Sequence, residues 1–345
     1  SPTLAPTAVS EDVIHLAIVW HQHQPVYFKD PETGVYAKPW VRVHAAKDYY
    51  DMAAILKDYP EIHTAFNLTP SLIRQLDDFA AGATDRYWEM TMVPADELTE
   101  EQKRFLLRRF FDINERIIER LPRYVELQAI RAGAGDEAIE AALESWTAQD
   151  FRDLQVLFNL AWTDPSFLAE EPLASLVEKE QGFSEEDKAI VLDEHLRILK
   201  AVIPLHRDMQ GSGQIEVTMT PFAHPILPLL VDSNLASVAM PSAELPAPPF
   251  RYGEDASAQV ERGVAMYQEH FGTDPQGMWP AEGSVAQIIV NMVGDAGVQW
   301  MASDEGVLAK SLGMDSFARD TDDLVQDADA LYRPYTVMGA QEIPV

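Results

Sequence analysis

The sequence predicts an α/β fold, specifically a barrel of alternating β-strands and α-helices that carries an all-helical insertion. Three observations lead to this prediction. Short apolar stretches end repeatedly in polar residues and are followed by amphipathic segments, which is the order of a β/α barrel. Residues 84–208 interrupt that order with helical patterns only. With 345 residues, of which 47% are hydrophobic, the chain can also bury a large core.

Five apolar stretches have the composition of buried parallel strands. They cover residues 14–20, 62–68, 214–220, 277–281 and 299–302. Amphipathic patterns outside the insertion predict helices over residues 71–79, 256–270 and 284–294. Prolines crowd residues 241–249, and we expect a stiff surface loop there.

Within the insertion, apolar residues recur at near-helical spacing over residues 101–132, and helical patterns resume over 137–160 and 185–202. We therefore expect one barrel domain over residues 13–345, with the insertion between its second and third strands, and a flexible tail over residues 1–12. The tail is rich in Pro, Thr and Ala and begins with Ser1. This start favours a processed, exported protein, extracellular or periplasmic, although a cytoplasmic location also fits.

The composition excludes several classes of protein. The chain has 26 Lys and Arg residues against 56 Asp and Glu residues, a formal net charge of −30. Such a charge repels phosphate backbones and anionic lipid headgroups, so we expect no nucleic-acid partner and no binding to membrane surfaces. No apolar run reaches the roughly 20 residues that span a bilayer. The chain has no cysteine, which excludes disulfides, zinc–thiolate sites and cysteine nucleophiles.

Polar side chains follow the predicted strands, and such strand ends meet on one face of a β/α barrel. We therefore expect one pocket lined by His21, His23, His224, Glu282 and Asp304. Trp279 lies beside the same strand ends. Aromatic rings next to carboxylates suit a sugar, because the C–H faces of a pyranose stack on rings while its hydroxyls need charged acceptors.

Each of these residues also has a structural interpretation. Glu282 suits the nucleophile of a glycosidase, but it could instead accept the first N–H groups of the following helix. His21 and His23 lie on the same side of an extended segment, where they could bind a metal, contact sugar hydroxyls or form a structural pair. Asp304 is either a functional carboxylate or a helix N-cap. Glu216 within the third strand must be paired if it is buried.

Several long motifs, in order, resemble glycoside hydrolase family 57, in particular its amylopullulanase and α-amylase-like branch. The first is His-Gln-His-Gln-Pro at residues 21–25. The others lie at residues 213–230, 277–284 and 300–305, and residues 153–162 of the insertion are also similar to this branch.

The resemblance implies an incomplete seven-stranded barrel followed by a helical domain. It implies a retaining hydrolase of α-glucans such as starch, pullulan or maltodextrin, with Glu282 as nucleophile and no cofactor or essential catalytic metal. The partner would be an oligo- or polysaccharide. The substrate-binding residues that we expect on this basis are His21, His23, Gln24, His224, Trp279, Glu216 and Glu305. Asp304 would serve as acid/base or as a supporting carboxylate.

One departure from the family pattern concerns the general acid/base. The family's aspartate lies in a later motif that reads approximately Leu-Asp-Gly-Glu-Asn, and no such motif occurs before Val345. We therefore expect that the end of the barrel and the following helical domain are missing. One alternative is a carbohydrate-binding or inactive barrel fragment. Another is a metal-dependent hydrolase of the amidohydrolase or deacetylase type. His21 and His23 support this alternative, but further ligands from the middle strands are lacking.

Overall fold

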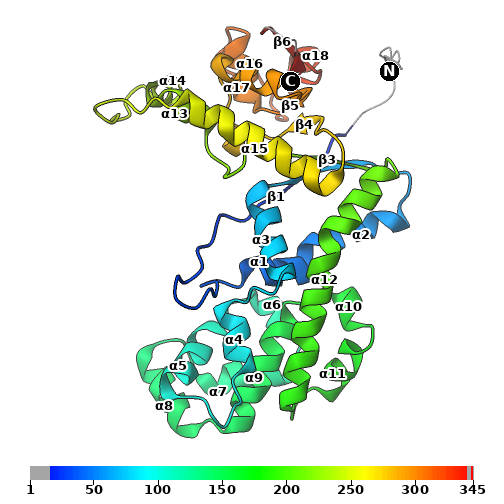
Figure 1. The fold of residues 1–345 in the computed structure, drawn as a ribbon, viewed down its shortest axis with the longest axis vertical. Coiled ribbons are helices and arrows are strands. Elements are labelled where there is room, and N and C mark those ends of the chain that lie inside the picture. The colour runs from blue at the N-terminus through cyan, green and yellow to red at the C-terminus, as the bar shows by residue number, and fades with distance from the viewer. Residues whose placement is uncertain (1–15, 340–342, 345) are drawn as a thin grey trace.

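A computed structural model describes residues 16–339 together with residues 343 and 344 (Figure 1). The predicted tail and the first two residues of the predicted first strand lie outside these residues. Strands β1 (Val19–Gln22), β2 (Thr64–Leu68) and β3 (Ile215–Thr218) form a parallel sheet in that order. Strands β4 (Gly277–Met278) and β5 (Trp300–Met301) are also parallel, and a bridge between Met219 and Met278 joins β4 to the end of β3.

The five predicted strands therefore lie side by side in chain order, as in an incomplete β/α barrel. The strand register sets two layers of side chains on one face. His21, Asn67 and Thr218 are paired across β1, β2 and β3, and one layer below them Val19 is paired with Ala65, and Ala65 with Glu216. Because strand side chains alternate, Phe66 and Val217 point to the opposite face, where they are buried under the helices.

Helices cover that opposite face. Those that contribute to its core include α3 (Pro70–Ala80), α15 (Gly253–Phe271), α16 (Gln287–Asp295) and the C-terminal half of α12 (Glu185–Gly211). Short helices connect β1 to β2: α1 (Trp40–His44), η1 (Ala45–Tyr49), α2 (Asp51–Ala54) and η2 (Ile55–Asp58). The remaining segments are α13 (Leu227–Val231), η3 (Ser233–Leu235), α14 (Ala236–Ala239), η4 (Ala281–Gly283), α17 (Glu305–Ser311), α18 (Ala328–Leu331) and the antiparallel strands β6 (Thr336–Val337) and β7 (Ile343–Pro344).

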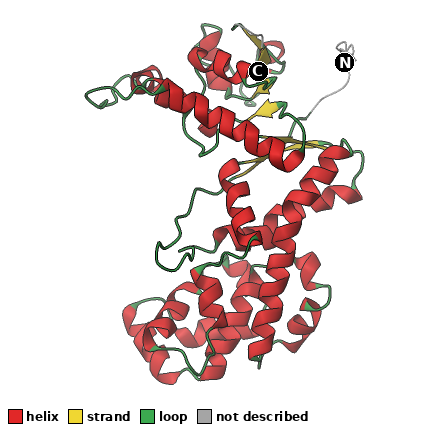
Figure 2. Ribbon diagram, in the orientation of Figure 1, coloured by secondary structure: helices red, strands yellow, loops and turns green. Residues whose placement is uncertain are grey.

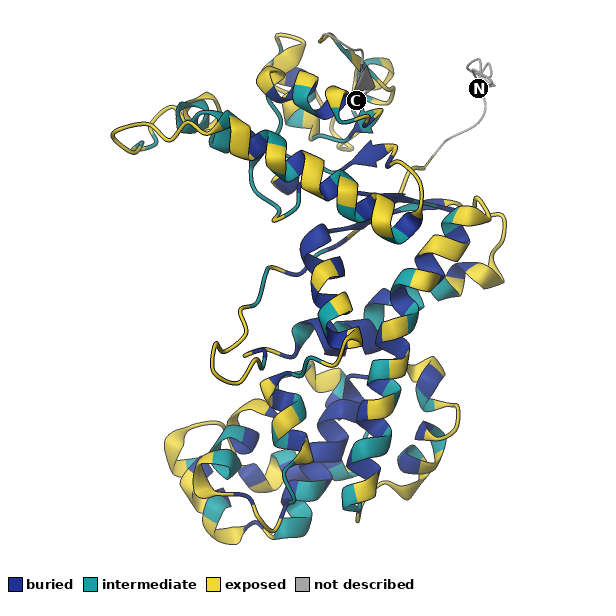
Figure 3. Cartoon of the chain, in the orientation of Figure 1, coloured by how far each residue is buried: buried dark blue, intermediate teal, exposed yellow. Residues whose placement is uncertain are grey.

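Between α3 and β3 the elements are all helices, joined by loops (Figure 2). The helices are α4 (Arg86–Met92), α5 (Glu100–Arg109), α6 (Glu115–Ile118), α7 (Pro122–Arg131), α8 (Asp136–Ser145), α9 (Ala148–Ala161), α10 (Pro165–Leu168), α11 (Leu173–Lys179) and α12. They enclose a second apolar core, separate from the one beneath the strands, and Figure 3 shows its buried interior in the lower part of the view. Among the described helices, none has the length and apolarity that a membrane crossing requires.

Three sequence predictions about elements were wrong in detail. The single helix predicted over residues 101–132 is three helices, because Asn114 caps α6 and Pro122 begins α7. The helix predicted over residues 137–160 is also divided, at Trp146 and Thr147, since Thr147 forms a capping box that starts α9. The first strand, predicted over residues 14–20, begins only at Val19 among the described residues and ends at Gln22, so His21 lies within β1.

A buried polar network joins the strand-bearing part to the insertion. The guanidinium of Arg42 on α1 pairs with Asp85, the N-cap residue of α4, at 2.6 Å. It also donates to Asn159 on α9 at 2.9 Å and to Nδ1 of His195 on α12 at 2.8 Å. Because Arg42 and Asp85 are almost completely buried, loss of either partner would leave an uncompensated charge in the interior. The network therefore fixes four helices relative to one another.

The lower layer of the barrel face is closed by an aromatic side chain. Trp300 on β5 reaches across Gly277 on β4 and donates its indole N–H to Glu216 on β3, at 2.8 Å. A Cβ atom at position 277 would lie only 2.3 Å from two ring carbons of Trp300, so this crossing requires glycine. A carboxylate within a strand needs a hydrogen-bond partner, and for Glu216 this partner is the indole of Trp300.

We expect Gly277→Ala to lower the free energy of unfolding by about 1–3 kcal/mol, because the added methyl group displaces Trp300 from Glu216. Equilibrium denaturation in urea measures this loss. Gly211→Ala, in the last turn of α12, is the matched control, because a Cβ there meets no atom within 4 Å. It should change stability by less than about 1 kcal/mol. Equal effects of the two substitutions would contradict this account of Gly277.

Candidate active site

Three histidines gather at the carboxyl ends of the parallel strands. His21 ends β1 with Gln22, His23 follows directly, and His224 lies in the loop after β3. The ring of His21 lies 5.5 Å from that of His23 and 5.2 Å from that of His224, and the rings of His23 and His224 are stacked at 4.1 Å. The ring of Trp279, just after β4, lies 5.9 Å from that of His21.

The hydrogen bonds of Asn67 define which ring nitrogen of His21 carries a proton. The backbone oxygen of Met219 can only accept, so the atom of Asn67 that faces it at 2.9 Å is the amide nitrogen. The amide oxygen of Asn67 then faces Nδ1 of His21 at 2.6 Å. An amide oxygen also only accepts, so Nδ1 carries the proton. In the neutral ring Nε2 therefore has a free lone pair.

His224 is held in an unusual environment. Its side chain is only 6% exposed, its backbone has a φ of +56°, and its Nε2 has no hydrogen-bond partner among the described residues. Burial, together with the nearby rings of His23 and His21, lowers the pKa of His224 to about 4. Burial and His21 also lower the pKa of His23, against the opposite effect of Glu282. His224 is therefore neutral near pH 7.

Glu282 stands beside this group in a strained backbone conformation. It lies in η4 with a φ of +58°, which costs a residue other than glycine about 1–3 kcal/mol. One of its carboxylate oxygens is 3.7 Å from Nδ1 of His224, and its side chain is 67% exposed. With His224 neutral, this contact is not an ion pair. The carboxylate is thus positioned at the opening of the site rather than bound into a structural salt bridge.

Three other predicted site residues, Gln24, Asp304 and Glu305, have partners outside the group of histidines. The amide of Gln24 is buried and bonded to the hydroxyls of Tyr49 and Tyr27, each at 2.8 Å. Asp304 has the second of the two roles that the sequence left open, because its carboxylate caps α17 through the N–H of Gly306 at 2.7 Å. Glu305 forms an exposed ion pair with Arg319.

Glu216 lies one layer below the histidines, where Trp300 holds it. Asn67 is the site residue that sequence reasoning missed. A polar residue within a largely apolar strand was the signal that could have found it, but its importance depends on the register of three strands.

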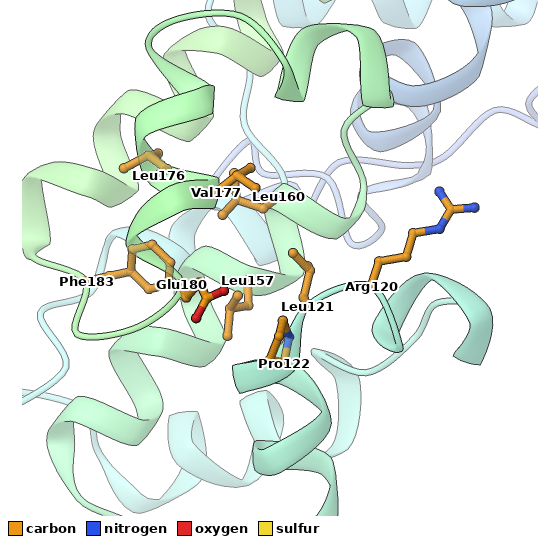
Figure 4. Close-up of a pocket in the computed structure, with 9 residues that line it drawn as sticks. All are labelled: Arg120, Leu121, Pro122, Leu157, Leu160, Leu176, Val177, Glu180 and Phe183. Atoms are coloured by element: carbon orange, nitrogen blue, oxygen red, sulfur yellow. The ribbon is translucent and has the colours of Figure 1, made fainter.

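A small cavity of about 60 Å³ lies away from the histidines, inside the insertion between α7, α9 and α11 (Figure 4).

The same group offers nitrogen ligands. His21, His23 and His224 each present a ring nitrogen such that these atoms lie within 4.8 Å of one another. Among the described residues, this is the one set of three His, Asp or Glu side chains with that property. The site therefore combines an exposed carboxylate, an indole wall and three imidazoles, and an unprotonated imidazole nitrogen can accept a hydrogen bond from a hydroxyl group.

Comparisons with known proteins identify related sequences and structures. The model of glycosyl hydrolase family 57 matches residues 17–345. No curated protein matches the chain in sequence. A solved α-amylase from Thermotoga maritima is 15% identical, with a TM-score of 0.42, over 85% of this chain and 40% of that chain.

Two solved branching enzymes are also similar. The enzyme of Thermococcus kodakaraensis is 17% identical with a TM-score of 0.44, over 94% of this chain and 46% of its own. That of Pyrococcus horikoshii is 16% identical with a TM-score of 0.45, over 94% and 45%. The chain thus spans less than half the length of these proteins.

We expect long-range ¹H–¹⁵N NMR spectra to show neutral His21 with its proton on Nδ1. In Asn67→Leu this tautomer should lose its preference, because the amide acceptor is gone. The substitution should also cost about 1–3 kcal/mol of stability, since the hydroxyl of Thr218 and the carbonyl of Met219 lose a donor. A proton on Nε2 in the unsubstituted protein would contradict the assigned hydrogen-bond direction.

Proposed function

The chain belongs to glycosyl hydrolase family 57, and from this premise we propose that it forms the part of a retaining α-glucan-active enzyme in which Glu282 is the nucleophile. The single observation that carries the proposal is the position of Glu282. Its carboxylate is exposed and its backbone is strained. The ionisable side chain that it contacts is the neutral imidazole of His224, whose Nδ1 lies 3.7 Å from a carboxylate oxygen. A carboxylate without a structural partner is available for attack on a sugar.

The chemistry follows from this placement. An oxygen of Glu282 attacks the anomeric carbon of a bound glucosyl unit and forms a covalent ester, while the bond to the leaving oxygen breaks. Water then attacks the same carbon and releases the sugar with its original anomeric configuration; an acceptor sugar in place of water gives transfer. The free Nε2 of His21 accepts a hydrogen bond from a sugar hydroxyl, and Trp279 provides an apolar wall for a pyranose face.

The leaving oxygen of a glucan must also be protonated by a second carboxyl group, about 5–5.5 Å from the nucleophile in a retaining pair. Asp304 and Glu305 do not suit that role, because one caps α17 and the other pairs with Arg319. A test of Glu282 alone should therefore use a substrate whose leaving group needs no proton. An α-glucosyl fluoride has this property.

We expect Glu282→Gln to lower the rate of α-glucosyl fluoride hydrolysis by about 10³-fold or more, because the amide is a poor nucleophile. Fluoride release, followed with an ion-selective electrode, measures the rate. Glu178→Gln, on α11 of the insertion, is the matched control, since it also removes an exposed glutamate. Its rate should stay within about twofold of the original.

Both variants should melt at about the temperature of the original chain, because Glu282 has no ion pair to lose and a substitution at an exposed surface position such as Glu178 changes stability by only about 0.5 kcal/mol or less. Retention of more than about a tenth of the rate by Glu282→Gln would exclude Glu282 as nucleophile.

A further inference from the structure

We propose that His21, His23 and His224 bind one transition-metal ion of the zinc type, and that the ion and a sugar exclude each other from the site. The metal-binding part stands on the geometry of the histidines alone. The exclusion part rests on the proposed function, which places a glucosyl unit against the same rings.

The first argument is the convergence of the ligand atoms. The three ring nitrogens already lie within 4.8 Å of one another. Zinc–nitrogen bonds of about 2.0–2.1 Å in a tetrahedral arrangement require separations of about 3.3 Å. The most widely separated nitrogens must therefore approach by up to about 1.5 Å, and the stacked pair of His23 and His224 must open. His23 is half-buried and has room to turn, whereas His21 can keep its hydrogen bond to Asn67.

The second argument concerns His21. Histidines that bind metals almost always donate their other ring N–H to an oxygen acceptor, which fixes the tautomer and orients the ring. Asn67 supplies that acceptor at 2.6 Å, and is itself held by Thr218 and Met219. His21 is thus set with the lone pair of Nε2 free, as a metal ligand requires.

The third argument concerns His224. Its imidazole is more than nine-tenths buried, and its Nε2 has no hydrogen-bond partner in the described part of the chain. A buried nitrogen without a partner loses its hydrogen bond to water without compensation, and the left-handed backbone at this residue adds further strain. Such costs at one residue are expected where a ligand is bound rather than where packing alone is at stake.

The donor set selects the class of ion. Three imidazole nitrogens suit Zn²⁺, Ni²⁺ and Cu²⁺, whereas Ca²⁺ and Mg²⁺ require oxygen ligands. An ion bound here would occupy the lone pair of His21 and stand beside Glu282, whose carboxylate lies 3.7 Å from His224. A sugar hydroxyl could then no longer bind the same atoms, so ion and sugar compete.

Isothermal titration calorimetry of the chain with Zn²⁺ tests whether the three histidines bind a metal ion. About 0.3 M salt screens weak binding to the acidic surface. We expect one ion per chain, and at least tenfold weaker binding in His23→Ala and in His21→Ala. His63→Ala is the control, because His63 is exposed and its ring contacts the backbone oxygen of Gly213, away from the three histidines. Its affinity should be unchanged.

A thermal melt first verifies that each variant is folded, and two ligand variants keep the test decisive if one of them is not. Absence of one-to-one binding would overturn the metal site. So would equal affinity for the original chain and for a folded His23→Ala or His21→Ala.

The second part is tested by repeating the titration with saturating maltotriose, whose own binding is measured separately. We expect Zn²⁺ affinity to fall at least threefold. Unchanged Zn²⁺ affinity while maltotriose is bound would overturn the exclusion. If maltotriose does not bind but Zn²⁺ does, the proposed glucan function fails while the metal site stands, so the two failures are distinguishable.

Discussion

A single buried amide, that of Asn67, is the interaction on which the site depends. It connects three neighbouring strands, since it accepts from His21 on β1 and donates to Thr218 on β3 and to the backbone of Met219. It is placed there by the register of β1, β2 and β3. Because the carbonyl of Met219 can only accept, the orientation of the amide is determined, and with it the proton on His21. The pairing of the three strands, acting through Asn67, therefore determines which nitrogen of the exposed His21 ring carries the proton.

The rest of the site is strained around this rigid centre. His224 and Glu282 both have left-handed backbone conformations, in the loops after β3 and β4. Below the histidines, Trp300 crosses Gly277 and donates a hydrogen bond to Glu216, so the indole of Trp300 closes that layer. Strain of this kind persists only where the surrounding structure imposes it, and it concentrates at functional sites. The arrangement leaves the carboxylate of Glu282 free at the opening, which suits a nucleophile better than a structural acid.

The sequence was sufficient for the order of the strands, because short apolar runs follow simple rules. Of the five residues expected in one pocket, the three histidines and Glu282 lie together, whereas Asp304 caps α17. It failed where local hydrogen bonds override periodicity. Apolar spacing continues through residues 101–132, yet the cap at Asn114 and the proline at 122 divide them into three helices. Sequence reasoning also missed Asn67 and left two roles open for Asp304. The first depends on the register of three strands, and the second on whether a carboxylate turns toward the N–H of Gly306 or into the pocket.

The most direct test of the account is covalent trapping with an α-glucosyl fluoride that carries fluorine on its sugar ring. Fluoride leaves without a proton, so the trapping step needs the nucleophile and its pocket but not a general acid. Intact-mass measurement and peptide mapping should reveal one glucosyl adduct per chain, on Glu282. An adduct on another residue, or none on a chain that melts cooperatively, would contradict the assignment of Glu282 as the nucleophile.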